Sequence, residues 1–245
     1  MVTERAEGDE PAMGDLSELS ARAEEIGADE PAEKRMTFPN PLLVVVSGPS
    51  GVGKSTIVAE LAAVHPQVVP IVTATTRPRR PGEVDNVHYH FLPSEEFDAL
   101  REGGGLLESA NVHGYWYGTP IQQVRGILAA GRDAILTIDP QGARSVRQFV
   151  PDALLIFVMP PSLEDLDARL VARGSESAES LAIRRRNAEL EMASSDAYDY
   201  VIVNETGRPE EAAEQIWEII QAEARTPNRS GRVMQPAARS PAMSE

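Results

Sequence analysis

Residues 48–55 read G-P-S-G-V-G-K-S and come directly after the apolar run Leu42 to Val46. After the loop, Ile57, Val58 and Leu61 recur on one face of an expected helix. A strand that ends at a glycine-rich turn and continues as a helix directs several backbone N–H groups toward one point, where the helix N-terminus adds partial positive charge. A chance Gly/Ser turn is the alternative, but the strand before the loop and the helical pattern after it favour a phosphate site. The segment therefore predicts binding of a nucleoside triphosphate.

The loop also carries the side chains that such a ligand requires. Lys54 can reach the β- and γ-phosphates, and the Ser55 hydroxyl can ligate Mg²⁺. We therefore expect the nucleotide to bind with Mg²⁺, and Ser55 to be the protein ligand of the metal. The expected nucleotide-binding residues are Gly48, Pro49, Ser50, Gly51, Val52, Gly53, Lys54, Ser55 and Thr56.

The composition restricts the class of protein. The chain has 245 residues, enough for one sizeable domain with tails or for two small ones. It has no cysteine, which excludes disulfides and cysteine-based metal sites. Its apolar runs are too short to span a bilayer, and its acidic N-terminus lacks the apolar stretch of a secretory signal. We therefore expect a cytoplasmic protein without a membrane partner.

Charge is distributed unevenly along the chain. The formal net charge is −15; the first 40 residues are strongly acidic, residues 225–245 are net basic, and the long middle part is acidic. An acidic middle part argues against sequence-independent binding to a nucleic-acid backbone, which requires clustered positive charge. We therefore expect no nucleic-acid partner, and the sequence indicates no particular oligomeric state.

Both ends of the chain are poor in apolar residues, whereas the middle alternates between strand and helix patterns. We expect an acidic disordered tail at 1–40, a folded domain at 41–224 and a second disordered tail at 225–245. The expected strands are 42–47, 68–74, 134–139, 154–159 and 200–204, and the expected helices are 55–64, 141–149, 162–173, 181–194 and 209–224. Short apolar strands joined by helices are typical of an α/β protein whose parallel sheet is flanked by helices on both faces.

The stretch from about 75 to 118 interrupts this alternation. It contains two short expected strands, 87–92 and 106–112, around one helix, and we interpret it as a subdomain inserted between the core segments 41–74 and 119–224. Thr119, Pro120 and Gln122 then follow in the order of a helix start, with a hydroxyl N-cap and proline at the first helical position. We therefore expect a helix to begin at Pro120.

Two segments of this region narrow the chemistry. They read T-A-T-T-R-P-R-R-P-G-E-V-D-N-V-H-Y-H-F at 73–91 and E-S-A-N-V-H-G-Y-W-Y-G-T at 108–119. Together with the phosphate loop, they make the chain from about 42 to 222 resemble guanylate kinase, the family that transfers a phosphoryl group from ATP to GMP. The resemblance implies a P-loop NTPase fold with an inserted GMP-binding subdomain and a helical lid, here about 162–195. It also implies GMP and dGMP as acceptors and ATP with Mg²⁺ as the donor.

The resemblance assigns an acceptor site to residues of these motifs. Arg77 and Arg80 match the arginines that hold the acceptor phosphate, a role that suits the bidentate geometry of a guanidinium group. Tyr89 and Tyr117 match tyrosines whose hydroxyls contact the same phosphate. Glu108 matches the carboxylate that recognises guanine, and Thr73 and Thr119 match the hydroxyl positions beside it. Asp139 matches an acidic residue near the guanine edge and the metal.

On the donor side, the resemblance implies arginines from the lid. Arg169 and Arg173 match arginines that fold over the ATP phosphates, Arg184 is matched to a third, and Asn204 lies where the family places adenine. Because the acceptor is already an anionic phosphate, we expect no general base; catalysis would consist of positioning and charge neutralisation. The expected catalytic residues are Lys54, Arg77, Arg169, Arg173 and Arg184.

Several of these assignments have structural alternatives. Residues 77–80 can form a solvated basic turn, and residues 184–186 can be a charged helix face with one functional arginine among them. Trp116 and Tyr117 can pack on a strand of the subdomain, and for Trp116 we prefer that interpretation. His88 and His90 lack the carboxylate or cysteine pattern that would complete a metal site.

The chain departs from the family pattern at Thr137, because an acidic residue is usual two positions before Asp139. Positions i and i+2 lie on the same face of a strand, so the departure concerns either Mg²⁺ placement or one guanine contact. Two other functions remain open. An inactive guanylate-kinase-like binding module would be expected to lose an intact phosphate loop, and a relative with another acceptor, such as a sugar phosphate, need not keep Glu108.

Overall fold

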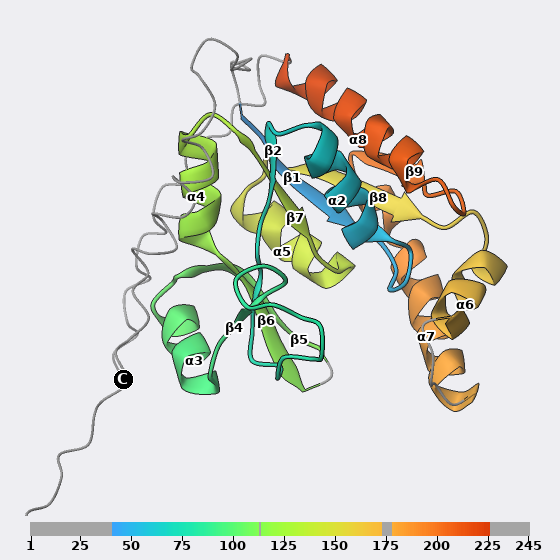
Figure 1. Ribbon diagram of the computed structural model, residues 1–245, viewed down its shortest axis with the longest axis horizontal. Coiled ribbons are helices and arrows are strands. Elements are labelled where there is room, and N and C mark those ends of the chain that lie inside the picture. The colour runs from blue at the N-terminus through green and yellow to red at the C-terminus, as the bar shows by residue number, and fades with distance from the viewer. Residues whose placement is uncertain (1–40, 113, 173–177, 226–245) are drawn as a thin grey trace, which may run out of the picture.

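The computed structural model describes residues 41–112, 114–172 and 178–225 (Figure 1). The expectations for residues 1–40, for 226–245 and for Arg173 therefore lie outside the described residues. The larger of two sheets has five parallel strands in the order β2-β7-β1-β8-β9. These strands are β1 (Leu43–Ser47), β2 (Val68–Pro70), β7 (Asp133–Thr137), β8 (Leu154–Met159) and β9 (Tyr200–Val203).

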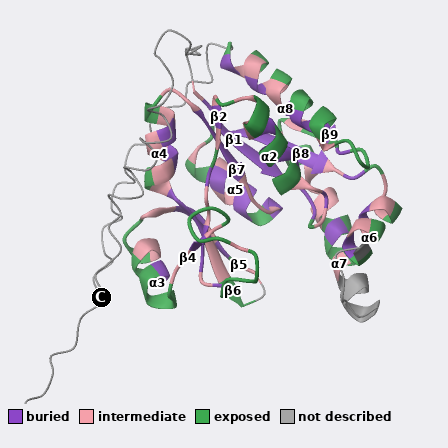
Figure 2. Ribbon diagram, viewed as in Figure 1, coloured by how far each residue is buried: buried purple, intermediate pink, exposed green. Residues whose placement is uncertain are grey.

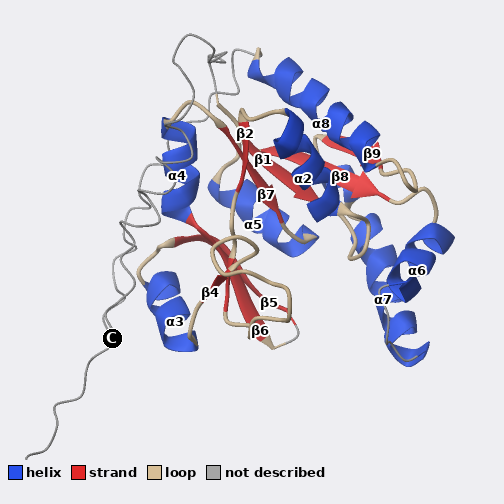
Figure 3. Ribbon diagram, viewed as in Figure 1, coloured by secondary structure: helices blue, strands red, loops and turns tan. Residues whose placement is uncertain are grey.

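The smaller sheet has four strands in the order β4-β3-β6-β5 and is accompanied by one helix. Its strands are β3 (Ala74–Thr75), β4 (His90–Phe91), β5 (Leu106–Val112) and β6 (Tyr115–Pro120), and the helix is α3 (Ser94–Glu102). The strands β3 and β5 both pair antiparallel with β6. This unit lies apart from the larger sheet, at the lower left of the view in Figure 3.

Helices cover both faces of the larger sheet. One face packs against α2 (Lys54–Val64) and α8 (Pro209–Ala224), and the other packs against α4 (Ile121–Ala129) and α5 (Pro140–Phe149). The helices α6 (Leu163–Ala172) and α7 (Ala178–Met192) lie near the end of β8, and a short 3-10 turn (Ser195–Ala197) leads to β9. Figure 2 shows that the buried residues concentrate along the strands of the larger sheet.

The apolar run of β1 is explained by this layering. Val44 and Val46 belong to the core on the α2 side, whereas Leu43 and Val45 belong to the core on the α5 side. Successive side chains of a strand point to opposite faces, so a strand that is covered on both sides is apolar at every position. The predicted parallel α/β fold is confirmed.

Three local expectations are wrong. Residues 68–74 do not form one strand, because β2 pairs with β7 and the chain then crosses to the smaller sheet, where β3 pairs with β6. The strand expected at 87–92 is limited to His90–Phe91. The helix expected at Pro120 begins at Ile121, and Thr119 does not cap it, because its hydroxyl donates to Glu108 at 2.6 Å.

The strand β7 also ends earlier than expected, at Thr137. Asp139 instead caps α5: its carboxylate accepts the N–H of Gly142 at 2.7 Å, and Pro140 occupies the first helical turn. Proline suits that position because its missing N–H would have no partner inside the helix. Thr137 and Asp139 therefore do not share a strand face, and the two residues belong to different elements.

Among the described residues, no helix combines the length and the apolar character that crossing a bilayer would require.

A buried carboxyl at the start of β7 predicts a pH-dependent stability. Asp133 is fully buried; one oxygen accepts the N–H of Leu42 at 2.8 Å, and the other has no hydrogen-bond partner in the described part of the chain. Burial raises the pKa of Asp133 from 3.8 to about 6, against the lowering effect of the Leu42 N–H. Between these two values the folded state binds more protons than the unfolded state, so stability falls as the pH rises through this interval.

We expect Asp133→Asn to remove this dependence. As the pH rises from 5 to 8, the variant should become more stable relative to the wild type. The unfolding free energies of both proteins are measured by urea titration. The expected shift is about 1.4 kcal/mol. An unchanged difference at the two pH values would contradict the assignment to Asp133.

Candidate active site

The phosphate loop connects β1 to α2 and contains three glycines with positive φ. Gly48, Gly51 and Gly53 have φ values of 144°, 88° and 103°. A Cβ atom at Gly48 would lie 2.3 Å from the carbonyl oxygen of Val158, and one at Gly53 would lie 2.5 Å from Nδ2 of Asn204. Both the backbone conformation and the available space therefore require glycine at these two positions.

The first turn of α2 brings a cation and two hydroxyls to this loop. Lys54 Nζ donates to the carbonyl oxygens of Gly48 at 2.7 Å and Pro49 at 3.1 Å, and Ser55 and Thr56 are exposed beside it. An ammonium group, hydroxyls and a helix N-terminus at one place suit a polyphosphate accompanied by a hard cation. In the described ranges, no group of three His, Asp or Glu side chains forms a metal site. A magnesium ion would therefore rely on Ser55 together with water and phosphate oxygens.

Arg77 is a buried cation at the end of β3, with 7% of its surface exposed. Its two Nη atoms donate to the two carboxylate oxygens of Glu83 at 2.7 and 3.0 Å, and its Nε donates to the hydroxyl of Tyr117 at 3.2 Å. The guanidinium carbon lies 5.4 Å from the ring centre of Tyr89. Arg77 is therefore not part of a solvated turn, whereas Arg80 is exposed.

Glu83 is held as an anion by these contacts. Hydrogen bonds from the Arg77 side chain and from the backbone N–H of Arg80 lower the pKa of Glu83 to about 2. The Arg77–Glu83 pair has the bidentate geometry in which a guanidinium group also binds phosphate.

Glu108 is a nearly buried carboxylate on β5, opposite the start of α5. It is 7% exposed, and its Oε1 accepts the hydroxyl proton of Thr119 at 2.6 Å. A Cβ atom at Gly142 would lie 3.2 Å from the other oxygen, Oε2, so α5 begins immediately beside this carboxylate. Burial raises the pKa of Glu108 to about 7, the charge of Asp139 adds to the rise, and the Thr119 hydrogen bond opposes it.

Thr73 lies between β2 and β3 and is partly exposed; its carbonyl oxygen accepts the N–H of His90 at 2.9 Å. The structure thus brings Glu108, Thr119 and Asp139 close together around Gly142, and it brings Arg77, Tyr89 and Tyr117 together on the smaller sheet. No contact between the Thr73 side chain and either group is recorded in the described residues.

Of the residues expected on the donor side, Asn204, Arg169 and Arg184 lie within the described residues. Asn204, directly after β9, is buried and donates from Nδ2 to the carbonyl oxygen of Val52 at 2.7 Å. Arg169 on α6 donates to the same carbonyl at 2.9 Å. Arg184 on α7 is partly exposed, whereas its neighbour Arg185 pairs with Asp167 at 2.7 Å and thereby connects α7 to α6.

Known proteins with similar sequences agree on one family. The family model described as guanylate kinase matches residues 40–223, about three quarters of the chain. The chain belongs to the guanylate kinase family. It is 50% identical over 167 residues to guanylate kinase of Symbiobacterium thermophilum, which covers 68% of this chain and 79% of the relative. It is 46% identical over 186 residues to guanylate kinase of Bifidobacterium longum, and this match covers 74% of this chain and 94% of the relative.

A solved guanylate kinase has the same architecture. The crystal structure of guanylate kinase from Anaplasma phagocytophilum superimposes with a TM-score of 0.64 at 34% sequence identity, covering 78% of this chain and 89% of that chain. The comparison confirms the predicted fold class of the guanylate kinase domain.

Two carboxylates were not among the expected site residues. Glu83 closes the motif T-T-R-x-x-R-x-G-E, and its fixed spacing from Arg77 is a signal that could have identified it. Glu191 on α7 lies near the phosphate loop: burial raises the pKa of Glu191, and Lys54 and the backbone of Ser50 oppose this rise. No sequence signal indicates that Glu191 lies near the phosphate loop, because α7 and the loop are distant in the chain.

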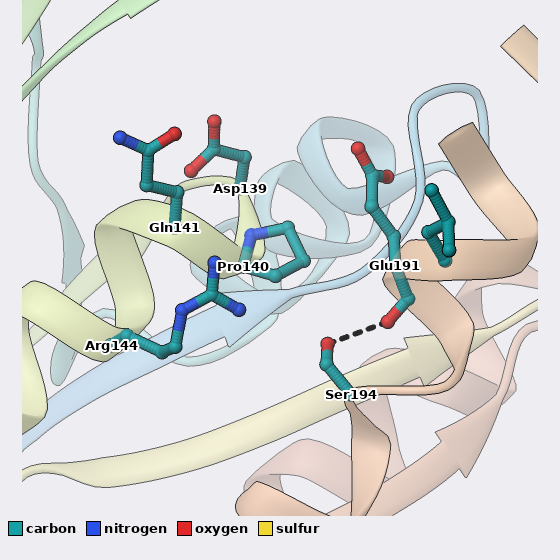
Figure 4. A pocket seen from close by; sticks show the side chains of 7 residues that line it. Asp139, Pro140, Gln141, Arg144, Glu191 and Ser194 are labelled. Carbon is teal, nitrogen blue, oxygen red and sulfur yellow. Dashed lines mark hydrogen bonds between the residues drawn. The ribbon is translucent and has the colours of Figure 1, made fainter.

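Glu191 also lines a polar pocket of about 230 Å³ between the start of α5 and the end of α7. Figure 4 shows Asp139, Gln141 and Arg144 on one side of this pocket and Glu191 with Ser194 on the other. The Ser194 hydroxyl donates to the backbone oxygen of Glu191 at 2.6 Å. The pocket therefore lies between Asp139 at the start of α5 and Glu191 near the end of α7.

Proposed function

We propose that this chain transfers the γ-phosphoryl group of ATP to GMP, giving ADP and GDP. The observation that carries the proposal is the arrangement of three groups: an intact phosphate loop, a buried Arg77 with tyrosines beside it, and the Glu108–Thr119 pair next to α5. Membership of the guanylate kinase family supports the same reaction. A bond forms between a GMP phosphate oxygen and the γ-phosphorus, and the bond from that phosphorus to the β-bridging oxygen breaks.

Each group has a defined part in this proposal. The phosphate loop from Gly48 to Thr56 and Asn204 bind ATP, and Lys54 neutralises charge on its β- and γ-phosphates. Bound Mg²⁺, held by Ser55, would neutralise phosphate charge further. Arg77, Arg80, Tyr89 and Tyr117 hold the acceptor phosphate, while Glu108, Thr73, Thr119 and Asp139 surround guanine. These contacts also admit dGMP, because none of them requires a ribose 2′-hydroxyl.

The remaining arginines complete the proposed donor side. Arg184 on α7 contributes positive charge over the ATP phosphates, and the same role is proposed for Arg173, which lies outside the described residues. Exclusion of water by the lid and by the smaller sheet limits hydrolysis of ATP. No group acts as a general base, because the attacking oxygen is already ionised.

A transfer assay tests the proposal directly. Purified protein is incubated with Mg²⁺, γ-labelled ATP and GMP, and label in GDP is measured. Label appearing in GDP, and not merely as inorganic phosphate, is the expected result. Release of inorganic phosphate alone, or equal labelling of a sugar phosphate, would contradict it.

The raised pKa of Glu108 predicts that GMP binding depends on pH. Two donors of guanine, N1–H and the N2 amino group, require an ionised carboxylate as their partner. Because burial raises the pKa of Glu108 to about 7, only a minor fraction of the protein carries this anion at pH 6. The affinity for GMP, measured by calorimetry, should therefore increase about tenfold from pH 6 to pH 8 and then level off.

The phosphate of GMP also titrates near pH 6, so a control is needed. Guanosine, which has no phosphate, should show the same increase with the wild type and no increase with Glu108→Gln. A flat pH profile for guanosine with the wild type would contradict the role of Glu108.

A further inference from the structure

The helix α6 packs directly on the phosphate loop. Leu166 and Leu170 are buried in the same core as Val52, and a Cβ atom at Gly51 would lie 2.8 Å from a terminal carbon of Leu170. The part of the expected lid formed by α6 is therefore in contact with the loop in this structure. The next polar side chain on this face of the helix is Arg169.

Arg169 connects three segments by hydrogen bonds. Its Nη1 donates to the carbonyl oxygen of Val52 at 2.9 Å, and its Nη2 donates to the carbonyl oxygen of Asn204 at 2.8 Å and to the hydroxyl of Thr206 at 2.9 Å. Three of the five N–H donors of a guanidinium group are thus bound to the protein itself. These contacts are additional to the expected role of Arg169, which is to fold over the ATP phosphates.

The Val52 carbonyl is held from outside the loop by two donors. Asn204 Nδ2 donates to it at 2.7 Å, in addition to Arg169. A planar trans peptide points its C=O and its N–H in opposite directions, so fixing the Val52 oxygen also fixes the direction of the Gly53 N–H. That N–H therefore points away from Arg169 and Asn204. Gly53 precedes α2 with φ of 103° and has no side chain that could hold the peptide by itself.

The Thr206 hydroxyl that accepts from Arg169 is itself held by a hydrogen bond. It donates to Asp165 Oδ1 at 3.1 Å, and the other oxygen of Asp165 accepts the hydroxyl proton of Ser162 at 2.5 Å. This chain of hydrogen bonds connects the start of α6 with the segment after β9. The guanidinium group is therefore held in one orientation, as a positioning group must be.

We infer that Arg169 is a positioning residue that orients the Val52–Gly53 peptide, so that the Gly53 N–H faces the phosphates of the bound nucleotide. The inference rests on the proposed binding of a nucleotide in this loop, but not on GMP as the acceptor. It assigns to Arg169 a role in the ligand-free protein, before any phosphate is present.

The ligand-free protein provides the first test. The Gly53 amide resonance is followed by ¹⁵N nuclear magnetic resonance in the wild type, in Arg169→Met and in the control Arg208→Met. Arg208 is an exposed arginine whose side chain pairs with Glu211. We expect the Gly53 resonance to shift and its hydrogen exchange to accelerate in Arg169→Met only. An unchanged resonance would overturn the inference, because an arginine that acts only on phosphates has no effect in their absence.

Binding of inorganic tripolyphosphate provides the second test, because this probe lacks adenine and is insensitive to base contacts of Asn204. We expect Arg169→Met to weaken its binding by about tenfold to a hundredfold, and Arg169→Lys to restore part of the loss. Because Asn204 acts on the same carbonyl, the effects of Arg169→Met and Asn204→Ala should be non-additive in a double-mutant cycle. Strictly additive effects would overturn the inference.

The two tests separate this inference from the proposed function. If Arg169→Met does not fold, as judged by circular dichroism, Arg169→Lys is used for the same resonance and binding measurements. A protein that binds tripolyphosphate through Arg169 but does not phosphorylate GMP would support the inference while refuting the proposed reaction. A lower kcat with unchanged tripolyphosphate binding and an unchanged Gly53 resonance would assign Arg169 to the transferred phosphoryl group instead.

Discussion

Lys54→Met is expected to lower the rate of phosphoryl transfer severely while the protein remains folded. The Nζ atom lies over the phosphate loop, bonded to the carbonyl oxygens of Gly48 and Pro49. Methionine fills the space of the aliphatic stem but provides neither the charge for the β- and γ-phosphates nor the contacts within the loop. Loss of one preorganised charge contact of this kind typically lowers the rate by ~10²–10³-fold. Turnover within a few-fold of the wild type would contradict the assignment of Lys54.

The control for this substitution follows from the composition. The chain contains only one other lysine, Lys34, and Lys34→Met should leave turnover unchanged. An amine-directed reagent offers a second measurement, because ATP should protect Lys54 from acylation but not Lys34. The melting temperature of both variants establishes whether the fold is retained.

The second large effect concerns the choice of base. Guanine presents N1–H and the N2 amino group as adjacent donors, whereas adenine has a lone pair at N1 and no 2-amino group. Glu108 is nearly buried, and Thr119 already satisfies one side of its Oε1. A buried carboxylate that faces adenine would therefore lose both hydrogen bonds without compensation by water. A site of this kind can discriminate by factors of ~10⁴, so we expect GMP to be used and AMP, CMP and UMP to be rejected.

Glu108→Gln should lower kcat/KM for GMP severely, because the amide turns an N–H donor toward a donor of guanine. The exposed Glu95, at the start of α3, provides a matched control as Glu95→Gln. Steady-state kinetics with GMP and with AMP are measured for the wild type, Glu108→Gln and Glu95→Gln. If AMP serves as well as GMP, or if Glu108→Gln leaves GMP kinetics unchanged, Glu108 does not recognise the base.

The parallel core and the phosphate loop could be predicted because local spacing determines them. The glycines of the loop require positive φ at positions that the motif itself fixes, and the apolar strand before it is covered on both faces. The structure and the comparisons confirm the fold class and the family. The roles of the individual site residues remain predictions, which the substitutions above test.

Other features depend on contacts between distant residues and could not be predicted in this way. The pattern of Val68 to Thr75 does not indicate that β2 and β3 belong to different sheets. Thr119 has the sequence context of an N-cap, yet a buried carboxylate competes successfully for its hydroxyl. Arg169 meets Val52 across 117 positions, and no local rule of helix structure contains that information.

The internal pairing of Arg77 with Glu83 determines which anions the acceptor side attracts. Although the motif at 77–80 is rich in arginine, its buried guanidinium already has a neutralising carboxylate, held there by two hydrogen bonds from the side chain. A free inorganic phosphate or sulfate ion would have to compete with Glu83 and would bring no base to contact Glu108. A nucleoside monophosphate offers both ends at once. If Arg77 holds the acceptor phosphate as proposed, its pairing with Glu83 would protect the site against occupation by the abundant small anions of a cell.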